Sequence, residues 1–115
     1  MFDKLGQIAG LMKNAGKIKQ GVEEMQRRLA AARFVGEAGG GQVRCTVDGQ
    51  GQPIKIGISP SLVQSGDVEL LEDLIVAGFA HAIQLSRAGM KKEVETMSAE
   101  YGLPGLGNLF GGGGV

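Results

Sequence analysis

The sequence is short of the residues that build several common kinds of functional site. Its 115 residues include one cysteine, one histidine, three prolines and no tryptophan, and its aromatic side chains are four phenylalanines and one tyrosine. A single cysteine cannot form an internal disulfide bond, and one cysteine and one histidine without a CxxC or HxxxH spacing do not indicate a metal site. No apolar run approaches the ~18 residues that a membrane-spanning helix needs. We therefore expect a cytoplasmic protein in a reducing compartment, without a membrane span or a metal.

The few residues whose side chains could act in catalysis have simpler, structural explanations. His81 stands between two alanines in a helical stretch, and Cys45 alternates with apolar neighbours on the inward face of a strand. The carboxylates of Glu69, Glu72 and Asp73 fall in the first turns of a helix, where the helix dipole favours negative charge. We expect no enzyme, no cofactor and no small-molecule substrate.

A phosphate-binding loop is also excluded. The stretch from Gly10 to Lys17 has five residues between its glycines, where the phosphate loop has four. Ile18 stands where a serine or threonine should hold magnesium, and no strand precedes the stretch.

Charge is balanced in total but not along the chain. Twelve basic and twelve acidic side chains give a formal net charge of zero. Residues 1–33 hold seven basic and three acidic groups, which makes this segment +4 and the remainder −4. Such asymmetry indicates directed electrostatics and is compatible with a polyanionic partner.

The first segment predicts one long helix over residues 5–33. Its apolar residues recur at alternating spacings of three and four, the heptad seam that packs against another helix. The seam consists of Ile8, Leu11, Ala15, Ile18, Val22, Met25, Leu29 and Ala32. Gly10, Gly16 and Gly21 each cost about 1 kcal/mol relative to alanine. Because this helix would be only marginally stable in isolation, we expect contact with a partner to stabilise it.

The middle segment predicts a small antiparallel sheet over residues 34–58. Apolar and polar residues alternate over 43–48 and over 53–58, the pattern of strands with one buried face. Glycines separate the expected strands at 39–41 and at 49–51, where tight turns need them.

The last segment predicts a second long helix over residues 67–101, with Asp67 as its N-cap. Residues 102–115 are glycine-rich and are expected to form a flexible tail after a single domain over 1–101. The predicted class is therefore α+β, in the order α-β-β-β-α.

One small sheet cannot cover two long apolar helix faces, so the economical solution is a homodimer. The residues expected in the dimer or core seam are Ile8, Leu11, Ile18, Val22, Met25, Leu29, Leu74 and Gly78. Gly78 predicts a close helix approach.

Basic residues fall on both predicted helices, outside the apolar seam. They can form an ordinary solvated surface or contact phosphates, and a dimer would offer roughly 6–10 such contacts, enough for strongly salt-dependent binding. The aromatic residues do not interleave with them as single-strand binders require, which favours duplex DNA read by backbone and shape. The candidate DNA-binding residues are Lys13, Lys17, Lys19, Arg27, Arg28, Arg87, Lys91 and Lys92.

The sequence resembles the YbaB/EbfC family of bacterial nucleoid-associated proteins. The likeness lies in the methionine-containing heptad helix over 11–29, Gly36-Glu37-Ala38-Gly39-Gly40-Gly41, and the strand over 54–58. It continues through Ser59-Pro60-Ser61-Leu62, Leu71-Glu72-Asp73-Leu74-Ile75 and a tail with Leu103-Pro104-Gly105-Leu106.

The resemblance implies a tweezer-like homodimer with two long helices protruding from a central sheet. It also implies DNA binding by these arms, no enzymatic activity, and a role in nucleoid organisation or expression. Gly16, Gly21 and Gly89 depart from the good helix formers expected in such arms. The alternative function is a dimeric adaptor for protein interactions in DNA replication or repair, without direct DNA contact.

Overall fold

The chain folds as two long helices joined through a small sheet. The computed structural model describes the backbone of residues 2–102 and the side chains of residues 14–102. The elements run α1 (Phe2–Ala31), β1 (Phe34–Ala38), β2 (Val43–Val47), β3 (Pro53–Ile58), α2 (Pro60–Gln64) and α3 (Val68–Tyr101). This order confirms the predicted α+β class, and only the single turn of helix at α2 was not expected. The tail from 103 onward lies outside the described residues.

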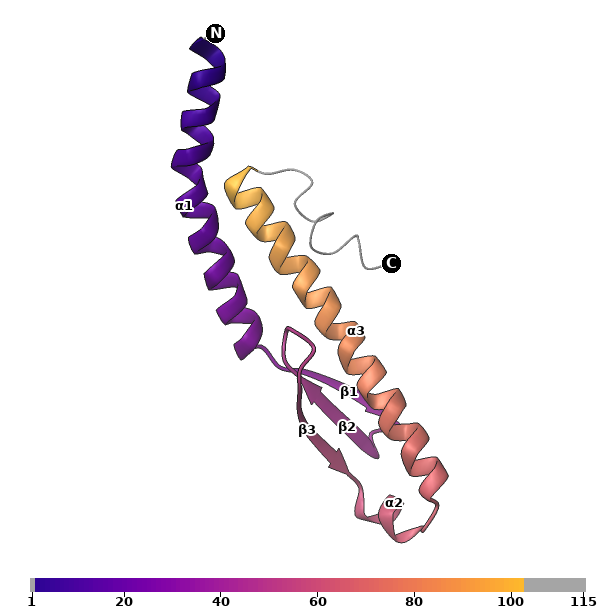
Figure 1. Ribbon diagram of the computed structural model, residues 1–115. Coiled ribbons are helices and arrows are strands. Elements are labelled where there is room, and N and C mark those ends of the chain that lie inside the picture. Colours follow the sequence, from indigo (N-terminus) through magenta and orange to yellow (C-terminus); the bar gives the residue numbers. More distant parts are fainter. Residues whose placement is uncertain (1, 103–115) are drawn as a thin grey trace.

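The molecule is a rod, with principal extents of 74, 25 and 16 Å. The sheet and the first half of α3 form one end, and α1 and the second half of α3 run side by side away from it (Figure 1). We call these two helical segments the arms. At 30 residues, α1 measures about 45 Å and continues past the end of α3 (Figure 1).

The sheet has the strand order β1-β2-β3, and both pairs are antiparallel. Gly39, Gly40 and Gly41 turn the chain between β1 and β2 with φ values of 64°, 68° and 90°, a region that side chains with a Cβ rarely adopt. Asp48 organises the turn between β2 and β3, because its Oδ1 accepts hydrogen bonds from the backbone N–H groups of Gln50 and Gln52 at 2.8 and 3.0 Å.

Both ends of α3 are capped. Asp67 is its N-cap, and the Asp67 carboxylate accepts a hydrogen bond from the backbone N–H of Leu70 at 3.0 Å. Gly102 ends the helix in the left-handed conformation, with φ of 63°. The prediction of Asp67 as the cap is therefore confirmed.

The main core lies between α3 and the sheet. Val43, Cys45 and Val47 point from β2 toward α3 and are fully buried. Gly78 is buried against them: a Cβ built on it would lie 2.8 Å from the Cys45 Sγ. The close approach expected at Gly78 is present, and the element that approaches it is β2 rather than a second helix. Gly36 of β1 similarly lies against the α3 backbone at Gly78 and Ala82.

A second core joins the two arms within one chain. Met25 and Leu29 of α1 and Val94 and Met97 of α3 are all buried, with exposures of 4% or less. Val22 is partly buried beside them. This half of the predicted seam is thus covered by the chain's own α3, whereas the sequence alone suggested that a partner held it.

The rest of the predicted seam has a different environment. Ala15 is exposed and Ile18 is half-buried, because α3 ends at Tyr101 before it reaches this part of α1. Leu74 packs at the margin of the main core. The side chains of Ile8 and Leu11 lie outside the described residues.

The strand β3 differs from the expectation of a half-buried strand. Its apolar residues Ile54 and Ile56 are 47% and 39% exposed, although Ile56 stands opposite the buried Cys45 in the sheet register. The reason is that α3 packs on β1 and β2 and leaves Ile54 and Ile56 open, whereas Ile58 at the end of β3 packs against the main core. Within the described chain, β3 is therefore an edge strand whose apolar face is uncovered at Ile54 and Ile56.

Candidate nucleic-acid interface

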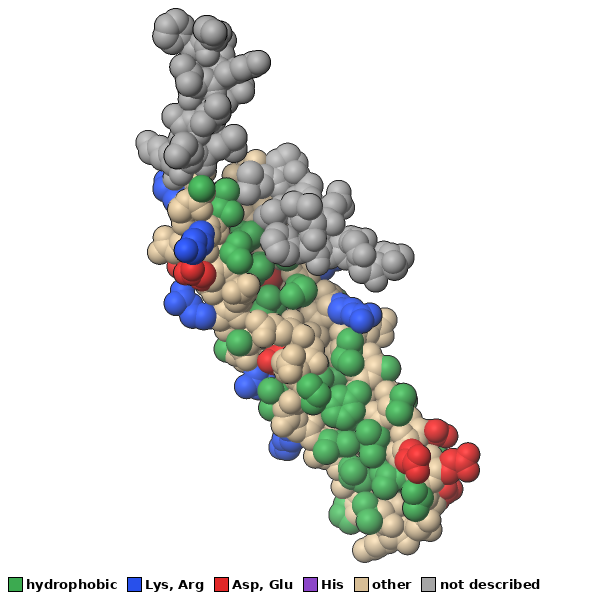
Figure 2. Space-filling view, in the orientation of Figure 1, with side chains coloured by type: hydrophobic (Ala, Val, Ile, Leu, Met, Phe, Trp, Pro, Cys, Tyr) green, Lys and Arg blue, Asp and Glu red, His purple; other side chains and the backbone are tan. Residues whose placement is uncertain are grey.

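The cations predicted on the first helix lie along α1. Lys17, Lys19 and Arg27 are exposed, and basic side chains are spread along this helix in Figure 2. The apolar seam determines this placement, because Val22, Met25 and Leu29 turn toward α3 and leave the polar positions facing solvent. The side chain of Lys13 lies outside the described residues.

The cations predicted on the second helix are exposed in the middle of α3. Arg87 and Lys91 are one helical turn apart, and Lys92 follows directly. Arg87 borders a shallow cavity of about 340 Å³ together with Met90 and the turn at 49–51. The basic part of α3 thus begins next to the sheet and ends at Lys92, and the rest of this arm carries only carboxylates, at Glu93, Glu95 and Glu100.

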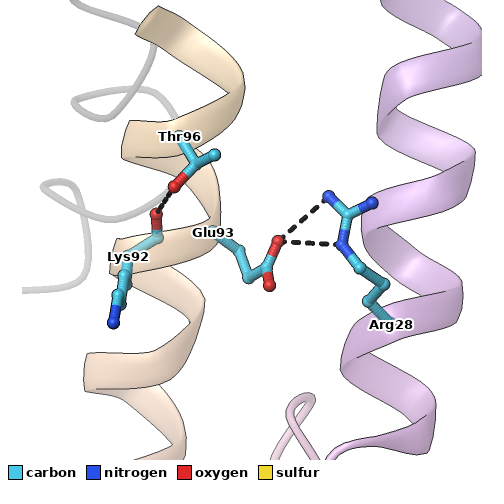
Figure 3. A network of polar contacts seen from close by, with 4 residues as sticks. All are labelled: Arg28, Lys92, Glu93 and Thr96. Atoms are coloured by element: carbon cyan, nitrogen blue, oxygen red, sulfur yellow. Dashed lines mark hydrogen bonds and ion pairs between the residues drawn. The ribbon is translucent and has the colours of Figure 1, made fainter. Parts of the chain in front are cut away.

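Arg28 differs from the other predicted cations, since it faces the second arm. Its Nε and Nη2 donate hydrogen bonds to the same Oε2 of Glu93, at 3.1 and 3.0 Å (Figure 3). This ion pair connects α1 to α3 across the gap between the arms. Glu93 was not among the residues predicted from the sequence, because a partner 65 residues away leaves no periodic signal on either helix.

A cleft opens beside this ion pair. Its volume is about 400 Å³, and it lies between the base of α1 and the middle of α3. Leu29, Ala32 and Phe34 form its apolar part, and Gly89 provides the space for the Phe34 ring. Polar side chains border the remainder: Arg28, Lys92, Glu93 and Thr96.

The turn at 48–52 fixes the sheet to both arms. The Ser86 hydroxyl of α3 donates a buried hydrogen bond to the Asp48 carbonyl oxygen at 2.9 Å. On the other side, the backbone N–H of Gly49 donates to the Leu29 carbonyl oxygen near the end of α1 at 2.7 Å. These two bonds set where the arms leave the sheet and therefore where their cations lie relative to each other.

Not every basic residue belongs to this surface. Arg33 closes the end of α1, with its Nη1 donating to the carbonyl oxygens of Ala30 and Ala32 at 2.9 and 2.8 Å. Arg44 lies on the sheet and forms an exposed ion pair with Glu37 at 3.3 Å. Both have local structural partners and lie outside the predicted set.

Acidic residues gather at the opposite end of the rod. Between Lys55 and Arg87 the sequence has no lysine or arginine. Four carboxylates in this stretch are exposed around the start of α3, where Figure 2 shows a group of acidic side chains. They are Asp67, Glu69, Glu72 and Asp73.

His81 and Cys45 both have structural surroundings. His81 is held by one hydrogen bond, in which its Nδ1 accepts from the backbone N–H of Glu37 at 3.0 Å. Burial raises the pKa of the Cys45 thiol. Among the residues that the structure describes, no three ligating side chains gather as a metal site, and no helix is long and apolar enough to cross a membrane.

Comparison with known proteins assigns the fold to a family. The model of the YbaB/EbfC DNA-binding family matches residues 4–101. The chain belongs to this family. This match confirms the resemblance seen in the sequence. The description of the family names DNA binding and no chemical reaction.

Relatives match nearly the whole chain. A nucleoid-associated protein of Synechococcus sp. (strain JA-3-3Ab) is 34% identical over 106 residues, which cover 92% of this chain and 95% of the relative. A nucleoid-associated protein of Granulibacter bethesdensis is 40% identical over 93 residues, covering 81% and 79%.

A crystal structure shows the same fold. The uncharacterized protein HP0035 from Helicobacter pylori superposes with a TM-score of 0.66 at 18% identity, covering 80% of this chain and 94% of that protein. The family member described here therefore shares the fold of that protein at low sequence identity.

Proposed function

We propose that this member of the YbaB/EbfC family is a nucleoid-associated protein that binds duplex DNA as a homodimer, largely by contacting phosphates. The observation that carries the proposal is the exposure of cations along both packed arms. Its role would be nucleoid organisation, which the names of its relatives support, or the regulation of expression.

The arms suit backbone contacts more than base readout. The cations on α1 and α3 are lysines and arginines at exposed positions. Tyr101, the one aromatic side chain in the part of the arms that the structure describes, packs against Gly21 and is not a free stacking platform. The cations are Lys17, Lys19, Arg27, Arg87, Lys91 and Lys92. Each phosphate that they neutralise releases condensed counterions, so binding should depend steeply on salt.

The uncovered face of β3 supports the homodimer. Ile54 and Ile56 are exposed on an edge strand, and an isolated sheet edge with apolar side chains favours association. A second copy placed against this face would bury these side chains and leave the arms of both copies free. The proposed dimer contact is therefore at the sheet, while the chain's own α3 covers the Met25 and Leu29 part of the seam.

Charge reversal at the arms tests the proposal. We expect Lys17→Glu/Arg27→Glu to abolish the mobility shift of random duplex DNA at ~100 mM salt, because four cations of the dimer become anions. The matched control is Arg44→Glu/Lys55→Glu, which changes the net charge equally but on the sheet.

The control should weaken binding much less than the arm variant. Equal loss in both variants, each shown by sedimentation to remain a dimer, would contradict binding by the arms and indicate only a net-charge effect. A wild-type protein that shifts no duplex DNA, yet retains a protein partner at high salt after nuclease treatment, would favour the adaptor function.

A further inference from the structure

The guanidinium of Arg28 is already occupied by a carboxylate. Among the described residues of the proposed interface, Arg28 alone forms an ion pair, and its partner Glu93 belongs to the other arm. The two donors, Nε and Nη2, lie on one edge of the guanidinium and meet the same oxygen at 3.1 and 3.0 Å (Figure 3). Arginine uses this fork of parallel donors to hold phosphates.

The pair is placed where a phosphate could replace the carboxylate. The Arg28 and Glu93 side chains are 51% and 31% exposed, so water screens the pair and makes it weak. Both border the cleft of about 400 Å³ between the arms, which leaves open space beside the guanidinium. Lys92 borders the same cleft and adds positive charge there.

We propose that Glu93 competes with DNA phosphate for Arg28. In the free protein the carboxylate holds the guanidinium across the arms, and on binding a phosphate takes its place. Glu93 thereby weakens DNA binding and lowers the salt concentration at which DNA is released. This inference rests on the proposed function, since it assigns Arg28 and its counter-ion a role in the same interface.

The first test is neutralisation of Glu93 in the full-length protein. Glu93→Gln should tighten binding to a random 30-base-pair duplex about three- to tenfold at ~50 mM salt, because two arginines of the dimer become available. The slope of log K against log salt should steepen by up to about two, at about 0.9 per added phosphate contact. Glu93→Ala, which also removes the hydrogen-bond acceptor, should have at least the same effect.

Glu95→Gln is the matched control for charge. Glu95 is exposed two residues further along α3, so its neutralisation removes the same charge from a different face of the helix. Glu95→Gln should tighten binding less than Glu93→Gln and leave the slope nearly unchanged. Thermal unfolding of each variant shows whether the fold is retained.

A double-mutant cycle decides between competition and simple charge. In an Arg28→Gln background, Glu93→Gln should change the affinity no more than Glu95→Gln does, because no guanidinium remains to be released. Equal tightening with and without Arg28 would overturn the proposal. So would weaker binding by Glu93→Gln, which would mean that the ion pair assists binding by bracing the arms. Wild-type protein that binds no duplex at all would instead overturn the proposed function.

Discussion

Tyr101, the last residue of α3, lies against Gly21 of α1 so closely that a Cβ on the glycine would come within 2.6 Å of the tyrosine Oη. The contact marks the point beyond which α1 continues without α3 beside it. A glycine that costs helix stability in isolation is therefore the residue that lets the end of α3 meet α1.

Gly16 and Gly21 of α1 should respond differently to alanine. A Cβ on Gly16 would have no atom of another segment within 4 Å, so Gly16→Ala should stabilise the protein by about 0.5–1 kcal/mol through helix propensity alone. Gly21→Ala gains the same propensity but displaces the Tyr101 ring, so its net effect should be smaller by about 1 kcal/mol. Urea unfolding measures both values, and an equal gain at the two positions would show that the Tyr101 contact contributes nothing.

The glycine in the main core should be far less tolerant. Gly78→Ala places a methyl group 2.8 Å from the Cys45 Sγ, and this overpacking should cost about 1–3 kcal/mol. Adding Cys45→Ala removes the sulfur and should recover part of that loss. The comparison uses the unfolding free energies of both single variants and the double variant. Strictly additive effects would contradict a direct steric conflict between the two positions.

The pKa of Cys45 predicts a pH dependence of stability. Because burial raises the pKa of this thiol, the unfolded chain loses the thiol proton at a lower pH than the folded chain. Between these two pKa values the folded state binds more protons, so its stability falls as the pH rises through the alkaline range above the ordinary thiol value. Cys45→Ala should show a shallower decline there when unfolding free energies are compared at neutral and alkaline pH. If the stabilities of the wild type and of Cys45→Ala declined in parallel with rising pH, the Cys45 thiol would not be the cause of the decline.

The exposed face of β3 predicts the behaviour of an interface variant. Ile56→Asp introduces a charge at a position that is 39% exposed in the single chain, so the monomer should retain its fold. A charge buried in the proposed contact would instead be costly, and the variant should sediment as a monomer. Lys55→Asp is the control, since Lys55 is the adjacent exposed residue of the strand. A dimer that survives Ile56→Asp would place the interface elsewhere.

The order of helices and strands could be predicted because it depends on local patterns. Spacings of three and four indicated the arm helices, alternation indicated β2, and Asp67 indicated where α3 begins. Each of these signals lies within a short stretch of the sequence. Each corresponds to an apolar face or a helix cap in the structure.

The remaining features depend on contacts between distant segments. The heptad places Arg28 beside the seam and Arg27 on the outward face, but nothing local indicates that Arg28 meets Glu93 of the other arm. The alternation in β3 resembles that in β2, and the exposure of Ile56 follows only from where α3 lies across the sheet. From the sequence alone, Gly21 and Gly89 only lower the stability of their helices. In the structure, the rings of Tyr101 and Phe34 occupy the space that a side chain would take at these two positions.

The stretch without lysine or arginine between Lys55 and Arg87, together with the excess of cations in residues 1–33, makes the rod an electric dipole, with carboxylates at one end and cations along α1. A polyanion exerts a torque on such a body before any contact forms. Collisions that begin at the acidic end are repelled, and rotation brings the arms around first. A molecule of zero net charge would thus approach a duplex because its dipole is oriented by the DNA, and not because of a net attraction. Its association rate would depend on the Debye length, which sets how far from the DNA the orienting torque acts.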